Sequence, residues 1–116
     1  MSEKEQKSAV LESCLAKPSA LAGLVSYADG SIVSKTIIDK SVGTITLFAF
    51  DKGQKLSEHT TPYDAVVQVI DGTVDLTISG NLVNVSEGQI IVMPANIPHA
   101  VAAREKFKML LIMIRA

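Results

Sequence analysis

Residues 53 to 72 read GQKLSEHTTPYDAVVQVIDG, and a second stretch, residues 88 to 103, reads GQIIVMPANIPHAVAA. Each stretch begins with a glycine and contains one of the two histidines of the chain, His59 and His99. Asp71-Gly72 lies between two apolar runs and is typical of a tight β-hairpin turn. The pattern predicts that the two stretches belong to one β fold and that the two histidines share one pocket.

Outward from these stretches, the chain consists of short runs of β-branched and apolar residues with period-two alternation, separated by turn residues. Many short strands at regular spacing are typical of an all-β sandwich or barrel. The predicted strands are Leu24–Tyr27, Ile32–Asp39, Thr44–Phe50, Ala65–Ile70, Thr73–Ile78, Leu82–Val85, Ile90–Met93, His99–Ala102 and Phe107–Ile114.

The N-terminal residues follow a different pattern. Val10, Leu11, Cys14 and Leu15 have the spacing of one face of an amphipathic α-helix, which we expect over residues 3 to 16. Pro18 ends that helix. The sequence therefore predicts a helical segment over residues 1 to 18 and a β-barrel domain over residues 19 to 116.

Composition narrows the classes of partner. The 116 residues carry a formal net charge of -1 without a basic block, which disfavours nucleic acid and membranes as partners. Cys14 is the single cysteine, so no intrachain disulfide forms, and the polar N-terminus lacks the apolar core of a signal peptide. We expect a cytoplasmic protein.

The last predicted strand, Phe107–Ile114, reads FKMLLIMI and is apolar on both faces apart from Lys108. A strand of this kind is buried on both sides. One side faces the barrel interior, and the other meets the N-terminal segment or a second subunit, because an exposed apolar strand aggregates. Together with the apolar content of 47%, this predicts a homodimer.

The first quoted stretch resembles the first motif of the cupin superfamily, the small RmlC-like jelly-roll barrels. That motif is a glycine, five residues, His-x-His, three or four residues, a glutamate, six residues and a glycine. Gly53, His59 and Gly72 match it with the correct spacing. Thr61 stands at the second histidine position, and Ala65 stands at the glutamate position.

The second stretch resembles the second motif of the same family, which is a glycine, five residues, Pro-x-Gly, two residues, a histidine, three residues and an asparagine. Gly88, Pro94 and His99 match, whereas Asn96 replaces the glycine and Ala103 replaces the asparagine. The resemblance covers roughly residues 43 to 114. It implies an all-β cupin jelly-roll barrel, to which the predicted N-terminal α-helix is an appendage.

The resemblance also implies a metal site, because a complete cupin site offers three histidines and a glutamate to one divalent ion, usually Fe, Mn, Ni or Zn. This sequence keeps two of the four positions, His59 and His99. Asp64 is the candidate third ligand if a bulge at Pro62-Tyr63 turns it to the same face; its other role is to cap the turn after Pro62. The alternative is a metal-free pocket in which the two imidazoles hydrogen-bond each other, a water or a backbone carbonyl.

The candidate ligand-binding residues are His59, Thr61, Gln68 and His99, where Gln68 interrupts an apolar run. Three functions remain open. The first is binding of a small organic molecule in a pocket with a degenerate metal site. The second is a metal-dependent enzyme of dioxygenase, isomerase or decarboxylase type that uses His59 and His99 as ligands. The third is a structural or assembly dimer with an idle pocket.

Overall fold

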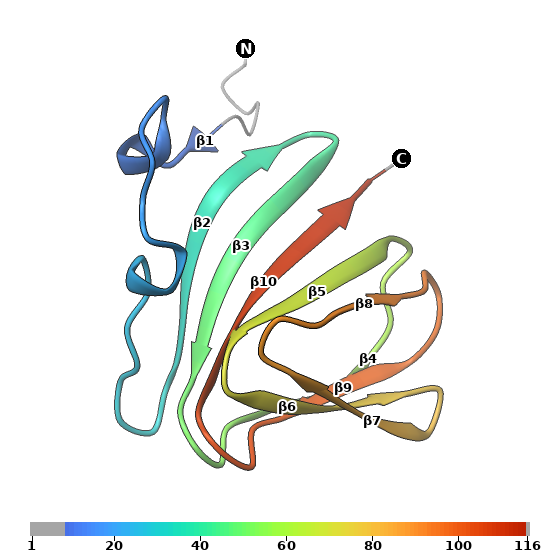
Figure 1. Cartoon of the computed structure of the whole chain (residues 1–116). Coiled ribbons are helices and arrows are strands. Elements are labelled where there is room, and N and C mark those ends of the chain that lie inside the picture. The colour runs from blue at the N-terminus through green and yellow to red at the C-terminus, as the bar shows by residue number, and fades with distance from the viewer. Residues whose placement is uncertain (1–8, 116) are drawn as a thin grey trace.

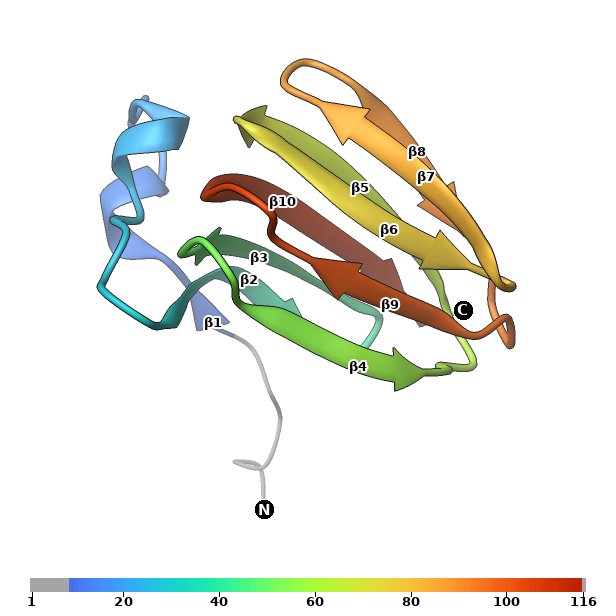
Figure 2. The ribbon, with the colours of Figure 1, turned by 90° about the horizontal axis from the view of Figure 1, so that it is seen from below.

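The computed structural model describes residues 9 to 115, which form two antiparallel β-sheets (Figure 1). The six-stranded sheet contains, in spatial order, β1 (Ala9–Val10), β2 (Ile32–Lys40), β3 (Gly43–Phe50), β10 (Phe107–Ile114), β5 (Asp64–Asp71) and β8 (Ile90–Met93). The four-stranded sheet contains β4 (Lys55–His59), β9 (His99–Ala102), β6 (Thr73–Ile78) and β7 (Asn81–Ser86). Figure 2 shows the two sheets as separate layers, so the predicted all-β jelly roll is confirmed.

The core lies between the sheets and follows the period-two alternation of the strands. In β5 the side chains of Ala65, Val67 and Val69 are buried, whereas the residues between them are partly exposed. The largest buried side chains are Phe50 and Phe107, whose rings stack with centroids 4.7 Å apart. The inward-facing residues of both sheets therefore form one continuous apolar core.

The predicted hairpin at Asp71-Gly72 joins β5 to β6. Gly72 adopts a positive φ of 76°, a conformation that glycine reaches without strain. A Cβ atom at this position would lie 2.6 Å from the carbonyl oxygen of Lys106. The glycine of the motif is thus required both by the turn and by the close approach of the loop before β10.

The N-terminal part differs from its prediction. Residues 1 to 8 lie outside the described residues. From residue 9 to residue 16 the chain forms β1 and the 3-10 helix η2 (Glu12–Cys14) in place of the predicted α-helix. The reason is the open edge of β2, on which Ala9 and Val10 pair and to which the amide of Leu11 donates a hydrogen bond of 2.8 Å at Ile37.

A second 3-10 helix, η3 (Leu21–Gly23), precedes Leu24–Tyr27, which is not the predicted strand but an irregular segment. The irregular segment packs on the outer face of the six-stranded sheet, where Val25 is buried against Leu47 and Ala49. Packing on this face removes the apolar side chains of Leu24, Val25 and Tyr27 at least partly from water, although the segment is not a strand. In residues 9 to 115, neither of the two helices is long and apolar enough to cross a membrane.

Candidate functional site

A small cavity of about 70 Å³ lies between the two sheets at the end of the barrel where β4 ends and β9 begins. One of its sides contains the two histidines, and the remainder of its wall is almost entirely apolar. The lining residues are His59, Thr61, Ala65, Met93, His99, Val101, Met109, Leu111 and Met113. The structure therefore brings both motif histidines into one pocket, as the sequence predicts.

A β-bulge places His59 in this pocket. Leu56 pairs with Val101 and His59 pairs with His99, so β4 takes three residue steps where β9 takes two. On a regular strand Leu56 and His59, three residues apart, would lie on opposite faces, whereas the bulge lets both face the interior. This register shift lies between Leu56 and His59, whereas the bulge that would make Asp64 a ligand would have to lie at Pro62-Tyr63.

A tight loop before β9 places His99. Asn96, at the position of the family's glycine, has a positive φ of 64°, a conformation that asparagine tolerates better than most other residues. Its amide donates a hydrogen bond of 2.7 Å to the carbonyl oxygen of Thr61. The substitution of asparagine for glycine thus preserves the loop and connects the second motif to the first.

The two imidazole rings lie edge to face, with centroids 4.4 Å apart and an interplanar angle of 68°. Nδ1 of His59 lies 2.9 Å from the carbonyl oxygen of Ser57, and Nδ1 of His99 lies 3.3 Å from that of Ile97. Because a carbonyl oxygen can only accept, each Nδ1 carries the proton. With the proton on Nδ1, the Nε2 atom of an imidazole without a second proton is free to accept a hydrogen bond or bind a metal.

The two histidines differ in their environment. The side chain of His59 is exposed, whereas His99 is only 5% exposed. Burial lowers the pKa of His99, the hydrogen bond to Ile97 opposes that shift, and the proximity of His59 lowers the pKa further. His99 is therefore held in its neutral form at neutral pH.

The other residues predicted for the site fall into two groups. Thr61 lines the cavity, although its hydroxyl donates a hydrogen bond of 3.0 Å to the carbonyl oxygen of Tyr63. Gln68 does not line the cavity, because it alternates with the inward-facing Val67 and Val69 and lies on the outer face of β5. The prediction that Gln68 belongs to the pocket does not agree with this placement.

Asp64 is not brought to the histidine pair. It lies opposite Ile114 at the start of β5, and its Oδ1 accepts a hydrogen bond of 2.8 Å from the amide of Ala95. Within residues 9 to 115, no group of three or more His, Cys, Asp and Glu side chains is placed to hold a metal ion. The role of Asp64 in the structure is thus to hold the loop before β9.

Three methionines, Met93, Met109 and Met113, also line the cavity, although neither family motif assigns them to a site. Met109 and Met113 alternate with Leu111 along β10, so the period-two pattern of FKMLLIMI already places the three on one face. Three flexible thioether side chains give the cavity a deformable wall.

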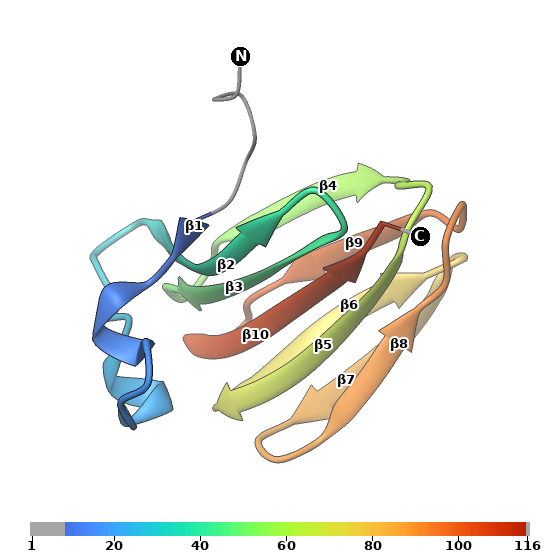
Figure 3. The same ribbon diagram turned by 90° about the horizontal axis from the view of Figure 1, so that it is seen from above.

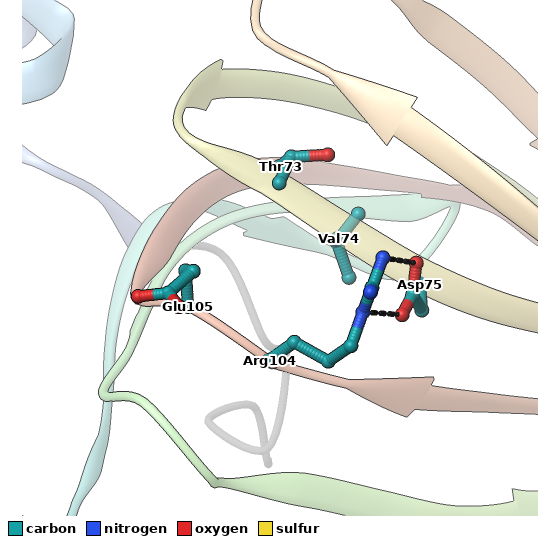
Figure 4. A pocket seen from close by; sticks show the side chains of 5 residues that line it. All are labelled: Thr73, Val74, Asp75, Arg104 and Glu105. Carbon is teal, nitrogen blue, oxygen red and sulfur yellow. Dashed lines mark hydrogen bonds and ion pairs between the residues drawn. The ribbon is translucent and has the colours of Figure 1, made fainter.

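A second, polar hollow of about 290 Å³ lies at the opposite end of the molecule, on the outside of β6 (Figure 4). It contains Asp75, only 7% exposed, whose carboxylate forms an ion pair with Arg104 and accepts a hydrogen bond of 3.0 Å from Asn84. The bonds from Asn84 and Arg104 lower the pKa of Asp75. Because these groups satisfy one another, the cluster joins the loop after β9 to the sheet.

Comparison with known proteins gives a consistent result. The family model described as "Cupin domain" matches residues 46–115. A conserved Streptococcus pyogenes protein of unknown function is 39% identical, with 88% of this chain and 90% of that chain covered and a TM-score of 0.84. A cupin 2 conserved barrel domain protein from Leptotrichia buccalis is 45% identical, with 80% of this chain but 45% of that chain covered and a TM-score of 0.77. No match is found among curated proteins.

Both motifs identified in the sequence fall within the matched region, and their histidines lie together in the barrel. A cupin superfamily protein from Desulfitobacterium hafniense, 24% identical over 88% of this chain and 94% of that chain, shares the fold with a TM-score of 0.83. The family model covers more than half of the sequence, and the Streptococcus pyogenes structure is similar over nearly the whole described fold. The chain belongs to the cupin superfamily.

Proposed function

We propose that this cupin binds a small, mostly apolar molecule that carries one or two hydrogen-bond donors, such as hydroxyl groups. The observation that carries the proposal is the pair of imidazoles, His59 and His99, on the wall of an otherwise apolar cavity, each with its Nδ1 beside a backbone carbonyl oxygen. Small-molecule sites are typically apolar hollows with a few polar groups that fix the orientation of the ligand. Two Nε2 acceptors side by side favour a ligand that donates.

The size of the cavity limits the ligand. A volume of about 70 Å³ is well below the several hundred Å³ of sites for drug-sized molecules. Larger ligands require the wall to move, and Met109 and Met113 are the side chains that can do so at low cost. His59 is exposed and His99 is buried, so His59 is the imidazole that is more accessible to a ligand from solvent.

A metal centre of the complete cupin kind does not fit the residues present. His59 and His99 supply two ligands, but Thr61 and Ala65 stand where the family has a third histidine and the glutamate. Two imidazoles hold a divalent ion weakly without a carboxylate or thiolate beside them. The proposal therefore rests on the imidazoles as hydrogen-bonding groups and derives no reaction from a metal.

The experiment monitors the methyl groups of the methionines by NMR while small phenols and alcohols are added. We expect shifts of the Met93, Met109 and Met113 signals that saturate in the wild-type protein, since these side chains line the cavity. His99→Ala should weaken binding at least ~10-fold through loss of a buried acceptor. Gln68→Ala is the matched control, because Gln68 is a polar residue on the opposite face of β5.

Two results would contradict the proposal. The first is a loss of binding in Gln68→Ala equal to that in His99→Ala. The second is about one tightly held divalent ion per chain in the purified protein, measured by elemental analysis and lost in His99→Ala. That second outcome would replace small-molecule binding by imidazoles with metal-dependent chemistry at the same two residues.

A further inference from the structure

The cavity that contains the two histidines also gathers the thioether sulfur atoms of the chain. Both histidines of the sequence line it, and so do three of the four methionines, Met93, Met109 and Met113. The fourth is Met1, so residues 9 to 115 hold no methionine anywhere else. The closed end of the same core is filled by other side chains, among them the stacked rings of Phe50 and Phe107. Methionine is therefore confined to the end of the barrel that carries the imidazoles.

The strand register sets two of these methionines on either side of one small residue. In the six-stranded sheet β5 lies between β8 and β10 (Figure 3). Ala65 on β5 pairs with Met93 on one side and with Met113 on the other. Directly paired residues of antiparallel strands have Cα atoms roughly 4.5–5.5 Å apart and side chains on the same face. The two thioether side chains thus flank the methyl group of Ala65, and all three residues line the cavity.

This arrangement changes the kind of donor at the position where the family motif has its glutamate. Ala65 stands at that position, and its side chain supplies no ligand. The long, flexible side chains of Met93 and Met113 can extend past it into the cavity. The carboxylate of Asp64 accepts a hydrogen bond from the amide of Ala95 and does not line the cavity. Around this position the chain therefore offers thioether sulfur where the motif offers a carboxylate oxygen.

The two imidazoles can each contribute one nitrogen to the same ion. Nδ1 of His59 lies beside the carbonyl oxygen of Ser57, and Nδ1 of His99 lies beside that of Ile97, which leaves Nε2 as the free nitrogen of each ring. Histidines that bind metals commonly donate their other ring N–H to a backbone carbonyl or a carboxylate. The rings lie edge to face with centroids 4.4 Å apart, close enough to be neighbouring ligands of one ion.

We propose that this cavity binds a soft monovalent cation, Cu(I), through the Nε2 atoms of both histidines and the sulfur atoms of Met93 and Met113. Thioether ligands select Cu(I), and imidazole also suits copper. A bound imidazole and a thioether are both uncharged, and no carboxylate lines the cavity. Burying an ion without a counter-charge is costly, and the cost rises steeply with the charge of the ion, so the site favours a monovalent over a divalent cation.

This inference goes beyond the proposed binding of an organic molecule and does not depend on it. The ion uses the sulfur atoms, whereas the organic ligand uses the imidazoles and the apolar wall. Both occupy the same volume of about 70 Å³, so the two ligands should compete. Replacing methionine by leucine separates them, because leucine has a similar volume and keeps the wall apolar but lacks the sulfur atom.

The test uses the full chain with Cys14→Ser, because the thiol is itself a strong soft ligand outside the cavity. Ag(I), a redox-inert substitute for Cu(I), is added while the methionine methyl signals are followed by NMR. Cu(I) is then added without oxygen, in competition with a coloured chelator. We expect one ion per chain and shifts of the Met93 and Met113 signals. Zn(II), which favours nitrogen, oxygen and thiolate ligands, should bind at least ~10-fold more weakly.

The double variant Met93→Leu with Met113→Leu should weaken the binding of Ag(I) and Cu(I) at least ~10-fold, because it removes both sulfur ligands. Phenol binding, followed at the remaining Met109 signal, should change by less than ~3-fold, since both imidazoles stay in place. Leu111→Ile alters the packing of the same wall without removing a donor. As the matched control it should leave both affinities within about twofold.

The inference is overturned if neither Ag(I) nor Cu(I) forms a one-to-one complex, or if Zn(II) binds as tightly as Ag(I). It is also overturned if the methionine variants keep the affinity of the parent chain, or if Leu111→Ile loses as much as they do. Met93→Leu and Met113→Leu are measured singly as well, so that the test survives a double variant that does not fold. Binding of phenols without binding of Ag(I) would sink this inference alone, whereas binding of Ag(I) without binding of phenols would sink only the proposed function.

Discussion

The two ends of the barrel are filled by different kinds of side chain. At the closed end, Phe50 and Phe107 are fully buried and stack, and the Gly72 turn lies against the loop before β10. At the other end the interior contains methionines and the two histidines, and a cavity remains. The difference indicates that the closed end is tightly packed, whereas the open end keeps the cavity in which we propose that a ligand binds.

The largest effect is expected from Phe107→Ala at the closed end. Its ring is fully buried and stacks on Phe50, so its removal should lower the free energy of unfolding by about 3–5 kcal/mol. Phe48→Ala, at a partly buried ring tilted toward Phe50, is the matched control and should cost less. Urea unfolding followed by circular dichroism measures both, and equal losses would contradict the assignment of tight packing to the stacked pair.

The next effect concerns the turn at the same end. Gly72→Ala combines a positive φ of 76° with a Cβ atom 2.6 Å from the Lys106 carbonyl oxygen, so it should cost ~2–4 kcal/mol. Gly80→Ala has a similar φ of 81° and open space around its Cβ position, so it should cost only the ~1–2 kcal/mol of backbone strain. The difference between the two variants in urea unfolding isolates the clash. Equal losses of stability in the two variants would mean that the clash with the Lys106 carbonyl oxygen costs nothing measurable.

A smaller effect is expected at the polar hollow. Asp75→Ala removes the carboxylate that joins the loop after β9 to β6, which should cost ~1–2 kcal/mol, since Arg104 can turn toward water. Glu105→Gln breaks a pair with Lys52 whose side chains are both about two-thirds exposed, and should change stability by less than ~0.5 kcal/mol. Thermal unfolding of both variants provides the comparison. A loss in Glu105→Gln as large as that in Asp75→Ala would show that the loop, rather than the buried carboxylate, carries the stability.

Features that depend on residues close together in the sequence could be predicted, whereas features that depend on contacts between distant residues could not. The turn at Asp71-Gly72 and the alternation of the strands were predictable, because both depend on residues adjacent in sequence. The meeting of His59 and His99 followed from motif spacing, although the bulge that turns His59 inward lies before it and not at Pro62-Tyr63. Backbone pairing across the sheet edge, which turned the expected N-terminal helix into β1, is a long-range effect that local periodicity does not contain.

Asp64 and Gln68 lie away from the histidine pocket, contrary to expectation, for a related reason. A one-residue change of register moves a side chain to the other face of a sheet, and no local pattern fixes where a bulge occurs. The loop amide of Ala95 engages Asp64, and the alternation of β5 places Gln68 outside. The methionines of the cavity were visible in the sequence, but the difference between filled core and cavity wall depends on packing from both sheets.

The smallest effect is the pH dependence of stability, which arises at the open end. Burial lowers the pKa of His99 below its ordinary value of 6.5, so the unfolded chain binds a proton more readily than the folded one. The neutral imidazole is therefore fully compatible with the fold above pH 6.5, and stability is lost as the pH falls from there toward the lower folded pKa. The variant His99→Gln has no such group, while all carboxylates and His59 remain the same in both proteins.

Urea unfolding at several pH values between about 7.5 and 5 measures this effect as the difference in unfolding free energy between wild type and His99→Gln. We expect the wild type to lose stability relative to the variant as the pH falls through 6.5. The reason is that the unfolded wild-type chain takes up a proton on His99 more readily than the folded chain does, and the variant has no such group. Parallel curves would mean that protonated His99 is as well accommodated as the neutral form. In that case the open end would tolerate charge on His99, and its pocket would suit an anionic ligand better than the donor-bearing molecule proposed above.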